Sequence, residues 1–541
     1  MASINNKLRR QRYYESVLIS SVNRTEQSHT NLDSSFIYFQ LLIDILLKSN
    51  CVYSLHDFIH ICKYEYYNDL VEQRRIDEFH QTYTQETSIE WYTKDCFVYR
   101  LLNRVLRQQN TDLLIKFQFL IKDIYEQLEQ FHQQQKRDWD HHQYVYRGQL
   151  MSTDELNHMK SNIGELISMN SFLSTTLDRE LAREFICCTE NNHNYQTVLF
   201  EIEIDRSSKR KPYANITQQS HFDSEEEILF MIGSIFRIVA INHEPELNTW
   251  IVQLVFCDDN ELELKPMYDY MKMEFVNNKY ALGKLLWQRC EFDQAEYYYR
   301  QQLLLHENDS ECYHGLGLIY RTKGHLDSAL VYHHQALELQ LPSDHKKLAY
   351  SYGYIGEIHI RKDENQLALK YFKLALYMFT NDQPNSAWCC HNLGILYRKQ
   401  KQYDLALKYF HRTLEKHQKY LPKGHPHEAA TINQIGIIYR CQGQYLQALE
   451  QHEKALEMRL KYLPAQHPYI SQSFQTIGLL YQDKGDNEQA LYYYDQAENI
   501  IKKGSPSNHR KLTTIQQQIK SIKITTTADF LYTDKKFLCK S

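Results

Sequence analysis

Apolar residues recur at helical spacing from residue 280 onward, in six versions of one unit. One unit reads YHGLGLIYRTKGHLDSALVYHHQAL, in which two amphipathic stretches flank a short polar turn at Lys323-Gly324. Each unit has a glycine in its first stretch and an alanine 12 residues later. These small residues are Gly283, Gly317, Gly356, Gly394, Gly436 and Gly478, then Ala295, Ala329, Ala368, Ala406, Ala448 and Ala490. The constant spacing predicts six helical hairpins.

The small residues indicate how the two helices of each hairpin pack. Glycine and alanine allow the helices to approach closely, and a larger side chain would push them apart. Leu316, Ile319 and Tyr320 lie around the glycine at helical spacing and would fill the interface. Because a single hairpin cannot bury its apolar face, we expect the units to stack into an all-α solenoid.

The unit resembles the tetratricopeptide repeat, whose small and aromatic positions match Gly394, Tyr397, Ala406 and Phe410. The glycine-to-glycine distance grows from 34 to 42 residues along the chain. The 42-residue units resemble the repeats of kinesin light chains. The resemblance implies that the concave face of the solenoid binds peptide or protein ligands.

The first half of the chain shows two patterns in succession. Helical spacing dominates residues 36–135, and after Tyr144 the period changes toward two. Between residues 198 and 204, apolar residues alternate with Glu201 and Glu203, which is typical of a half-buried strand. Further strand-like runs cover residues 227–241 and 250–257. We therefore expect an α+β domain that ends near residue 260.

These patterns divide the chain into six segments. We expect a helical region without an assigned role, the α+β domain, a linker, the six repeats, a capping helix and a tail. Their limits are residues 1–75, 76–260, 261–279, 280–507, 508–523 and 524–541.

Composition narrows the classes of protein to consider. With 16 Gly and 10 Pro in 541 residues, the chain is poor in turn residues, which favours long helices. A net charge of −5 argues against a nucleic-acid-binding protein. The 12 Cys form no C-x-x-C pair, so reduced thiols are expected rather than zinc sites or disulfides. The apolar stretch 36–47 is too short for a membrane helix and contains Asp44. With no signal peptide visible, we expect a cytoplasmic protein with no membrane partner.

Three short segments of the α+β domain are candidates for chemistry. They are Tyr146-Arg147-Gly148, Phe172-Leu173-Ser174-Thr175-Thr176 and the acidic run from Phe222 to Leu229. Each segment alone has an ordinary explanation. Arg147 could be a surface arginine, the Ser-Thr-Thr run could be the end of a strand, and the glutamates could form a solvated edge. In this order they resemble the R–S–E signature of arginine-modifying, cholera-toxin-like mono-ADP-ribosyltransferases. That family has a split β-sandwich with helices and cleaves NAD⁺ at the bond between nicotinamide and ribose.

The resemblance implies a role for each motif residue. Glu227 would be the catalytic carboxylate that stabilises an electron-poor ribose. Ser174 would position Glu227, and Arg147 would bind the pyrophosphate of NAD⁺. The remaining NAD⁺-binding residues would be Gly148, which allows close approach of the nucleotide, Thr175 and Phe185. Phe185 would stack on nicotinamide or serve as a core residue of its helix. Thr176 stands where the family usually has serine.

Two residues would handle the acceptor. Glu225 lies two residues before Glu227, and residues two apart on a strand face the same side. By resemblance this second carboxylate implies that arginine is the acceptor, because a carboxylate can hold a guanidinium and help remove its proton. Phe222 resembles the aromatic residue of the loop that meets the acceptor. The chemistry requires no metal.

Two alternatives to a transferase remain open. One is an inactive repeat adaptor with a degenerate catalytic domain. The presence of all four motif residues disfavours this alternative; they are Arg147, Ser174, Glu225 and Glu227. The other is an NAD⁺ glycohydrolase, in which water replaces the acceptor. The leading hypothesis is an NAD⁺-dependent arginine ADP-ribosyltransferase whose repeats recruit target proteins with exposed arginines.

Overall fold

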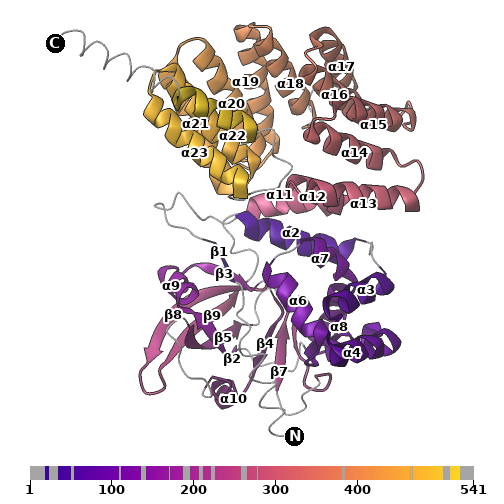
Figure 1. Cartoon of the computed structure of the whole chain (residues 1–541), viewed down its shortest axis with the longest axis vertical. Coiled ribbons are helices and arrows are strands. Elements are labelled where there is room, and N and C mark those ends of the chain that lie inside the picture. Colours follow the sequence, from indigo (N-terminus) through magenta and orange to yellow (C-terminus); the bar gives the residue numbers. More distant parts are fainter. Residues whose placement is uncertain are drawn as a thin grey trace, which may run out of the picture. The chain divides into compact units, whose positions relative to one another are not determined.

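The computed structural model divides into two compact units, Met1–Lys272 and Met273–Ser541 (Figure 1). It describes residues 19–22, 34–49, 54–108, 111–135, 142–169, 171–186, 195–205, 211–220, 226–257, 265–276, 278–379, 384–463, 465, 467–503 and 512–523. None of the helices within these ranges is both long and apolar enough to cross a bilayer.

The first unit is built on a nine-stranded mixed sheet in the order β1-β3-β8-β9-β5-β2-β4-β7-β6. Only the pairing of β5 with β9 is parallel among the described strands. The strands are β1 (Ile19–Val22), β2 (His142–Ser152), β3 (Leu166–Met169), β4 (Leu173–Thr176), β5 (Tyr195–Asp205), β6 (Tyr213–Asn215), β7 (Glu227–Phe230), β8 (Ile235–Glu244) and β9 (Thr249–Cys257). The expected α+β fold is confirmed.

The sheet is nearly interrupted between β2 and β4. Their register includes a single pair, Tyr146 with Thr176, whereas β2 pairs with β5 along its whole length. The strands β4, β7 and β6 therefore form a subsheet that diverges from the rest. This weak junction corresponds to the split expected in the β-sandwich. The chemical motifs lie on both sides of the junction, on β2 and on the β4-β7 pair.

Alternating side chains form the core of this unit. Val198, Phe200 and Ile202 of β5 are fully buried and pack with Phe230 and Phe256 from other strands. The predicted half-buried strand is confirmed: its alternate apolar side chains point into the core of the unit.

Helices that precede most of the strands in the sequence pack against this sheet. Gln40 of α2 donates to Ser168 Oγ (3.2 Å) and to the carbonyl of Gly233 (2.9 Å), so residues before position 76 pack directly on the strands. Gln135 of α8 bonds both main-chain groups of Asn215 on β6. The helices are α2 (Ser34–Lys48), α3 (Leu55–Glu65), α4 (Leu70–Thr82), the 3₁₀ turn Gln85–Thr87, α5 (Ser88–Thr93), α6 (Phe97–Gln108), α7 (Thr111–Lys116), α8 (Gln118–Gln135), α9 (Thr153–Ser161) and α10 (Arg179–Glu184).

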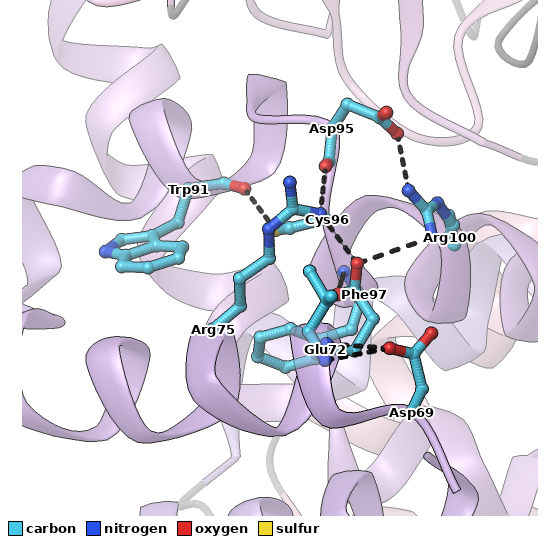
Figure 2. Close-up of polar contacts among 9 residues, drawn as sticks. Asp69, Glu72, Arg75, Trp91, Asp95, Cys96, Phe97 and Arg100 are labelled. Carbon is cyan, nitrogen blue, oxygen red and sulfur yellow. Dashed lines mark hydrogen bonds and ion pairs between the residues drawn. The ribbon is translucent and has the colours of Figure 1, made fainter. Parts of the chain in front are cut away.

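A buried carboxylate joins helices α4 and α6 (Figure 2). Glu72 of α4 is 2 % exposed and accepts bonds from Arg75 (2.6 Å) and from the amide of Phe97 (2.9 Å) at the start of α6. Arg100 lies 3.5 Å from Glu72 and also donates to Asp95 (3.1 Å). The negative charge thus lies at the positive end of α6, where it is stabilised.

The segment 261–279, expected to be a linker, contains helix α11 (Lys265–Val276). Tyr268 and Lys272 of this helix bond the carboxylate of Asp44 on α2 at 2.6 and 2.7 Å. Met267 and Met271 are buried. The apolar residues on one side of α11 give this segment a packed structure.

The described residues of the second unit form the end of α11, six helical hairpins and a closing helix over residues 512–523. Ile515, Ile519 and Ile522 of the closing helix pack with Ala490 and Tyr494. The hairpins are α12 (Ala281–Gln288) with α13 (Phe292–Leu305), α14 (Ser310–Lys323) with α15 (Leu326–Glu338), α16 (His345–Arg361) with α17 (Asn365–Met378), α18 (Ser386–Lys399) with α19 (Tyr403–Tyr420), α20 (Pro426–Cys441) with α21 (Tyr445–Tyr462) and α22 (Pro468–Asp483) with α23 (Asn487–Lys503). Residues 524–541 lie outside the described residues.

The repeated glycine lies against a ring from the second helix of its own hairpin. A Cβ on Gly394 would come within 2.6 Å of the Phe410 ring, and one on Gly317 would come within 2.6 Å of the His333 ring. Ala406 is fully buried. The glycine therefore makes room for a large side chain of the second helix rather than for its backbone.

Candidate active site

Glu227, the first residue of β7, is 2 % exposed and has a hydroxyl donor on each carboxylate oxygen. Ser174 Oγ donates to Oε1 at 2.5 Å, and Ser220 Oγ donates to Oε2 at 2.7 Å. Hydroxyl-to-carboxylate bonds are charge-assisted and hold the acceptor firmly. The carboxylate is therefore buried, compensated and fixed in orientation.

Strand register brings Ser174 to this carboxylate. In the antiparallel pairing of β4 with β7, Thr176 lies opposite Glu227, and Ser174 lies two residues farther along the same face. Thr175 points to the other face, where its hydroxyl donates to the carbonyl of Ile228 at 3.0 Å. Thr176 Oγ1 accepts a bond from the amide of Asp178, which begins helix α10.

Arg147 reaches the same place from β2, across the divergence of the sheet. Its Nη1 donates to the carbonyl of Ser174 at 2.7 Å, and its Nε donates to Gln149 Oε1 at 3.1 Å. The side chain is partly exposed. The structure thus brings Arg147, Ser174 and Glu227 together, although 80 residues separate the first from the last.

Gly148 and Phe185 meet at helix α10. A Cβ on Gly148 would lie 2.0 Å from the carbonyl oxygen of Ala182, so the close approach that requires glycine is to this helix. Phe185 packs in a small cluster with Leu150, Ala182 and Leu199. Phe185 is only partly buried in this cluster, so its packing is compatible with both expected roles.

The predicted acceptor residues Phe222 and Glu225 lie outside the described residues, in the interval 221–225. Their roles remain predictions. Among the described residues, no three His, Cys, Asp or Glu side chains are arranged to hold a metal ion.

Sequence reasoning missed the contribution of the turn that precedes the acidic run. Besides the bond from Ser220, the amide of Glu227 donates to Thr217 Oγ1 (3.1 Å) and its carbonyl accepts from the amide of Ile216 (2.8 Å). The sequence TQQS offers no periodicity or motif from which these contacts could be inferred. Serine and threonine are common in turns, so their presence in this segment does not indicate a contact with the catalytic carboxylate.

Tyr92 of α5 lies in the surroundings of the candidate site. It is buried, and its hydroxyl donates to Asn103 Oδ1 at 3.2 Å. Burial raises the pKa of Tyr92 well above its ordinary value, and the charges of Arg147 and Glu227 act on it in opposite directions. Tyr92 therefore lies within electrostatic range of the site and is neutral at physiological pH.

Family models match residues in both units of the chain. Residues 62–257 match the ADP-ribosyltransferase exoenzyme family. Residues 310–340, 347–419 and 427–503 match tetratricopeptide repeat families. The predicted repeat that begins at residue 280 lies outside these matches, although it forms the hairpin of α12 and α13.

Solved structures similar to parts of the chain include proteins of both kinds. Vis toxin, an ADP-ribosyltransferase from Vibrio splendidus, is 20% identical, with 39% of this chain and 85% of that chain covered and a TM-score of 0.27. BtubC from P. vanneervenii is 20% identical, covering 39% and 89%, with a TM-score of 0.31. TPR-like repeats of a Podosopora anserina kinesin light chain are 21% identical, covering 35% and 93%, with a TM-score of 0.28. These scores are too low to add to the family matches. By those matches, the chain carries an ADP-ribosyltransferase exoenzyme domain followed by tetratricopeptide repeats.

Proposed function

We propose that this protein transfers ADP-ribose from NAD⁺ to arginine side chains of target proteins and releases nicotinamide. The observation that carries the proposal is the contact of Ser174 with the buried Glu227 at 2.5 Å, beside an arginine that bonds the same serine residue. A buried, oriented carboxylate near a guanidinium suits a substrate that carries phosphates and whose sugar becomes cationic as the glycosidic bond breaks.

Glu227 would act on the ribose. When the bond between C1′ and the nicotinamide nitrogen breaks, the electron pair leaves with neutral nicotinamide and positive charge develops on C1′ and the ring oxygen. A carboxylate accepts up to about four hydrogen bonds. Glu227 can therefore keep both serine bonds, accept a bond from a ribose hydroxyl and stabilise the developing cation.

Arg147 would bind the pyrophosphate. Guanidinium has five N–H donors in a planar fork, and the bonds to Ser174 and Gln149 use only part of them. These two bonds would also hold the fork in a fixed plane before the substrate arrives. Gly148, Thr175 and Phe185 would complete the NAD⁺ site, with Thr175 supporting β4 through its bond to Ile228.

The acceptor arginine would attack C1′ through a guanidinium nitrogen. Its proton would pass to Glu225, and Phe222 would contact the acceptor. The repeats would bind protein partners and raise the local concentration of targets. A cytoplasmic location, with protein rather than nucleic acid or membrane as the partner, fits this role.

Incubation with labelled NAD⁺ tests the proposal and separates it from its alternatives. Label transferred to protein and released by hydroxylamine under arginine-selective conditions is the expected result. Free ADP-ribose without transfer would indicate a glycohydrolase, and no nicotinamide release would indicate an inactive adaptor.

Two glutamine variants refine this test. Glu227→Gln keeps the size of the side chain but removes its charge, so nicotinamide release should fall by about 100-fold or more. Glu225→Gln should impair transfer to arginine more than hydrolysis of NAD⁺. Full transfer activity in Glu227→Gln would contradict the assignment of the catalytic carboxylate.

A further inference from the structure

Ser220 makes a contact with the candidate catalytic carboxylate that the sequence motif does not contain. Its hydroxyl donates to Glu227 Oε2 at 2.7 Å, while Ser174 donates to Oε1. Ser220 is 5 % exposed, so this bond is shielded from water. A carboxylate that is bonded on only one oxygen can still rotate about its last torsion, whereas bonds on both oxygens fix its plane.

The backbone holds Ser220 in place for this contact. The turn over residues 216–220 is closed by bonds from the amides of Gln219 and Ser220 to the carbonyl of Ile216, at 2.9 and 2.7 Å. The same turn is attached to the main chain of Glu227, through the amide of Ile216 and the hydroxyl of Thr217. Ser220 is therefore fixed relative to the residue whose carboxylate it bonds.

We propose that Ser220 is a positioning residue for the reaction, which sets the plane of the Glu227 carboxylate from the side opposite Ser174. This inference rests on the proposed function. Two hydroxyls on two different elements, strand β4 and the turn, then clamp the carboxylate before NAD⁺ binds. The lone pairs not used by the two serines would be available to a ribose hydroxyl, and a carboxylate already fixed in its plane would need little reorientation in the transition state.

The test compares Ser220→Ala with the wild-type full-length protein. Because Ser220 contacts the carboxylate and acts through it, we expect kcat for nicotinamide release to fall about 10- to 100-fold, as for other small misplacements of a catalytic group. The Kd for NAD⁺, measured by calorimetry, should stay within about threefold. Ser220→Thr, which keeps the hydroxyl, should recover most of the lost kcat.

Two further variants distinguish positioning from a structural role. Ser234→Ala removes a fully buried hydroxyl of the same domain that donates to the carbonyl of Met231 at 2.7 Å, and it should leave kcat near the wild-type value. Ser174→Ala with Ser220→Ala should lose less than the product of the two single effects, because both serines act on one carboxylate.

Two results would overturn the assignment of Ser220 and leave the proposed function intact. One is wild-type kcat in Ser220→Ala while the wild-type protein is active. The other is a joint loss of NAD⁺ binding and thermal stability that Ser220→Thr does not restore. An inactive wild-type protein would instead refute the proposed function, and the role of Ser220 would fall with it.

Discussion

Phe185 has two expected roles, stacking on nicotinamide and packing in the core of its helix, and a substitution can separate them. Its ring packs against Leu150, Ala182 and Leu199 at the end of α10. As a core residue, it should tolerate Phe185→Leu at a cost of about 1 kcal/mol in the free energy of unfolding. The KM for NAD⁺ should then change by less than about threefold. Urea unfolding and initial-rate measurements check both values.

The opposite pattern would show that the ring contacts the substrate. A KM raised about tenfold or more at unchanged stability would indicate stacking on nicotinamide rather than packing. Leu150→Ala is the matched control, because it depletes the same cluster from strand β2 and should cost stability alone.

The residues of the candidate site differ in how far the sequence revealed them. Arg147, Ser174 and Glu227 stand in a recognisable order, and the strands bring them together. Ser220 was missed because its role depends on the direction of a hydroxyl in a turn, which no spacing rule records. The expected role of Gly148 at the nucleotide stays a prediction, and the structure adds a second reason for glycine at this position, the nearby carbonyl of Ala182 on helix α10.

The helices also differ in how far the local sequence predicts them. The six hairpins follow from periodicity, because most of their contacts lie within one hairpin or between hairpins adjacent in sequence. The sequence pattern predicts a linker where helix α11 lies, because the apolar face of this helix is short. Its packing depends on Asp44 of α2, whose carboxylate accepts hydrogen bonds from Tyr268 and Lys272. Elements stabilised by partners more than 200 residues away leave little trace in local sequence.

Glu72 should be a main stabilising contact among the helices of the first unit (Figure 2). Glu72→Gln keeps the shape of the side chain but removes its negative charge, so the ion pairs with Arg75 and Arg100 are lost and one acceptor oxygen becomes an NH₂ donor. We expect a loss of about 1.5–3 kcal/mol in the free energy of unfolding, measured with urea. Glu78→Gln is the control, because Glu78 pairs with Lys94 at the surface and should contribute at most about 1 kcal/mol. Equal effects of the two variants would contradict a special role for the buried carboxylate.

A buried histidine should make the repeats sensitive to acid. His452 of α21 is fully buried, and burial, with smaller effects of Arg440 and Arg459, lowers its pKa to about 4. The unfolded chain, with a histidine pKa of about 6.5, binds this proton first. The stability contributed by neutral His452 is therefore complete above about pH 6.5 and is lost on acidification toward pH 4, at about 1.4 kcal/mol per pH unit.

A neighbouring repeat provides the substitution that tests this pH dependence. Phe410 occupies in α19 the position that His452 occupies in α21, each four residues after the repeated alanine. His452→Phe should reduce the slope of unfolding free energy against pH between 4.5 and 6.5 by about one proton. Phe410→His should increase it. Unchanged slopes in both variants would refute the assignment of the linked proton to this position.

At the scale of the whole molecule, the two units have separate cores, one in the sheet and one in the stacked hairpins. Two cores of different construction predict two calorimetric transitions rather than one. Glu72→Gln should lower the midpoint of one transition at pH 7, and acidification to pH 5 should lower the midpoint of the other more strongly. His452→Phe should weaken that second response while leaving the first midpoint unchanged. A single transition that shifts with all three changes would show that sheet and repeats unfold as one cooperative body.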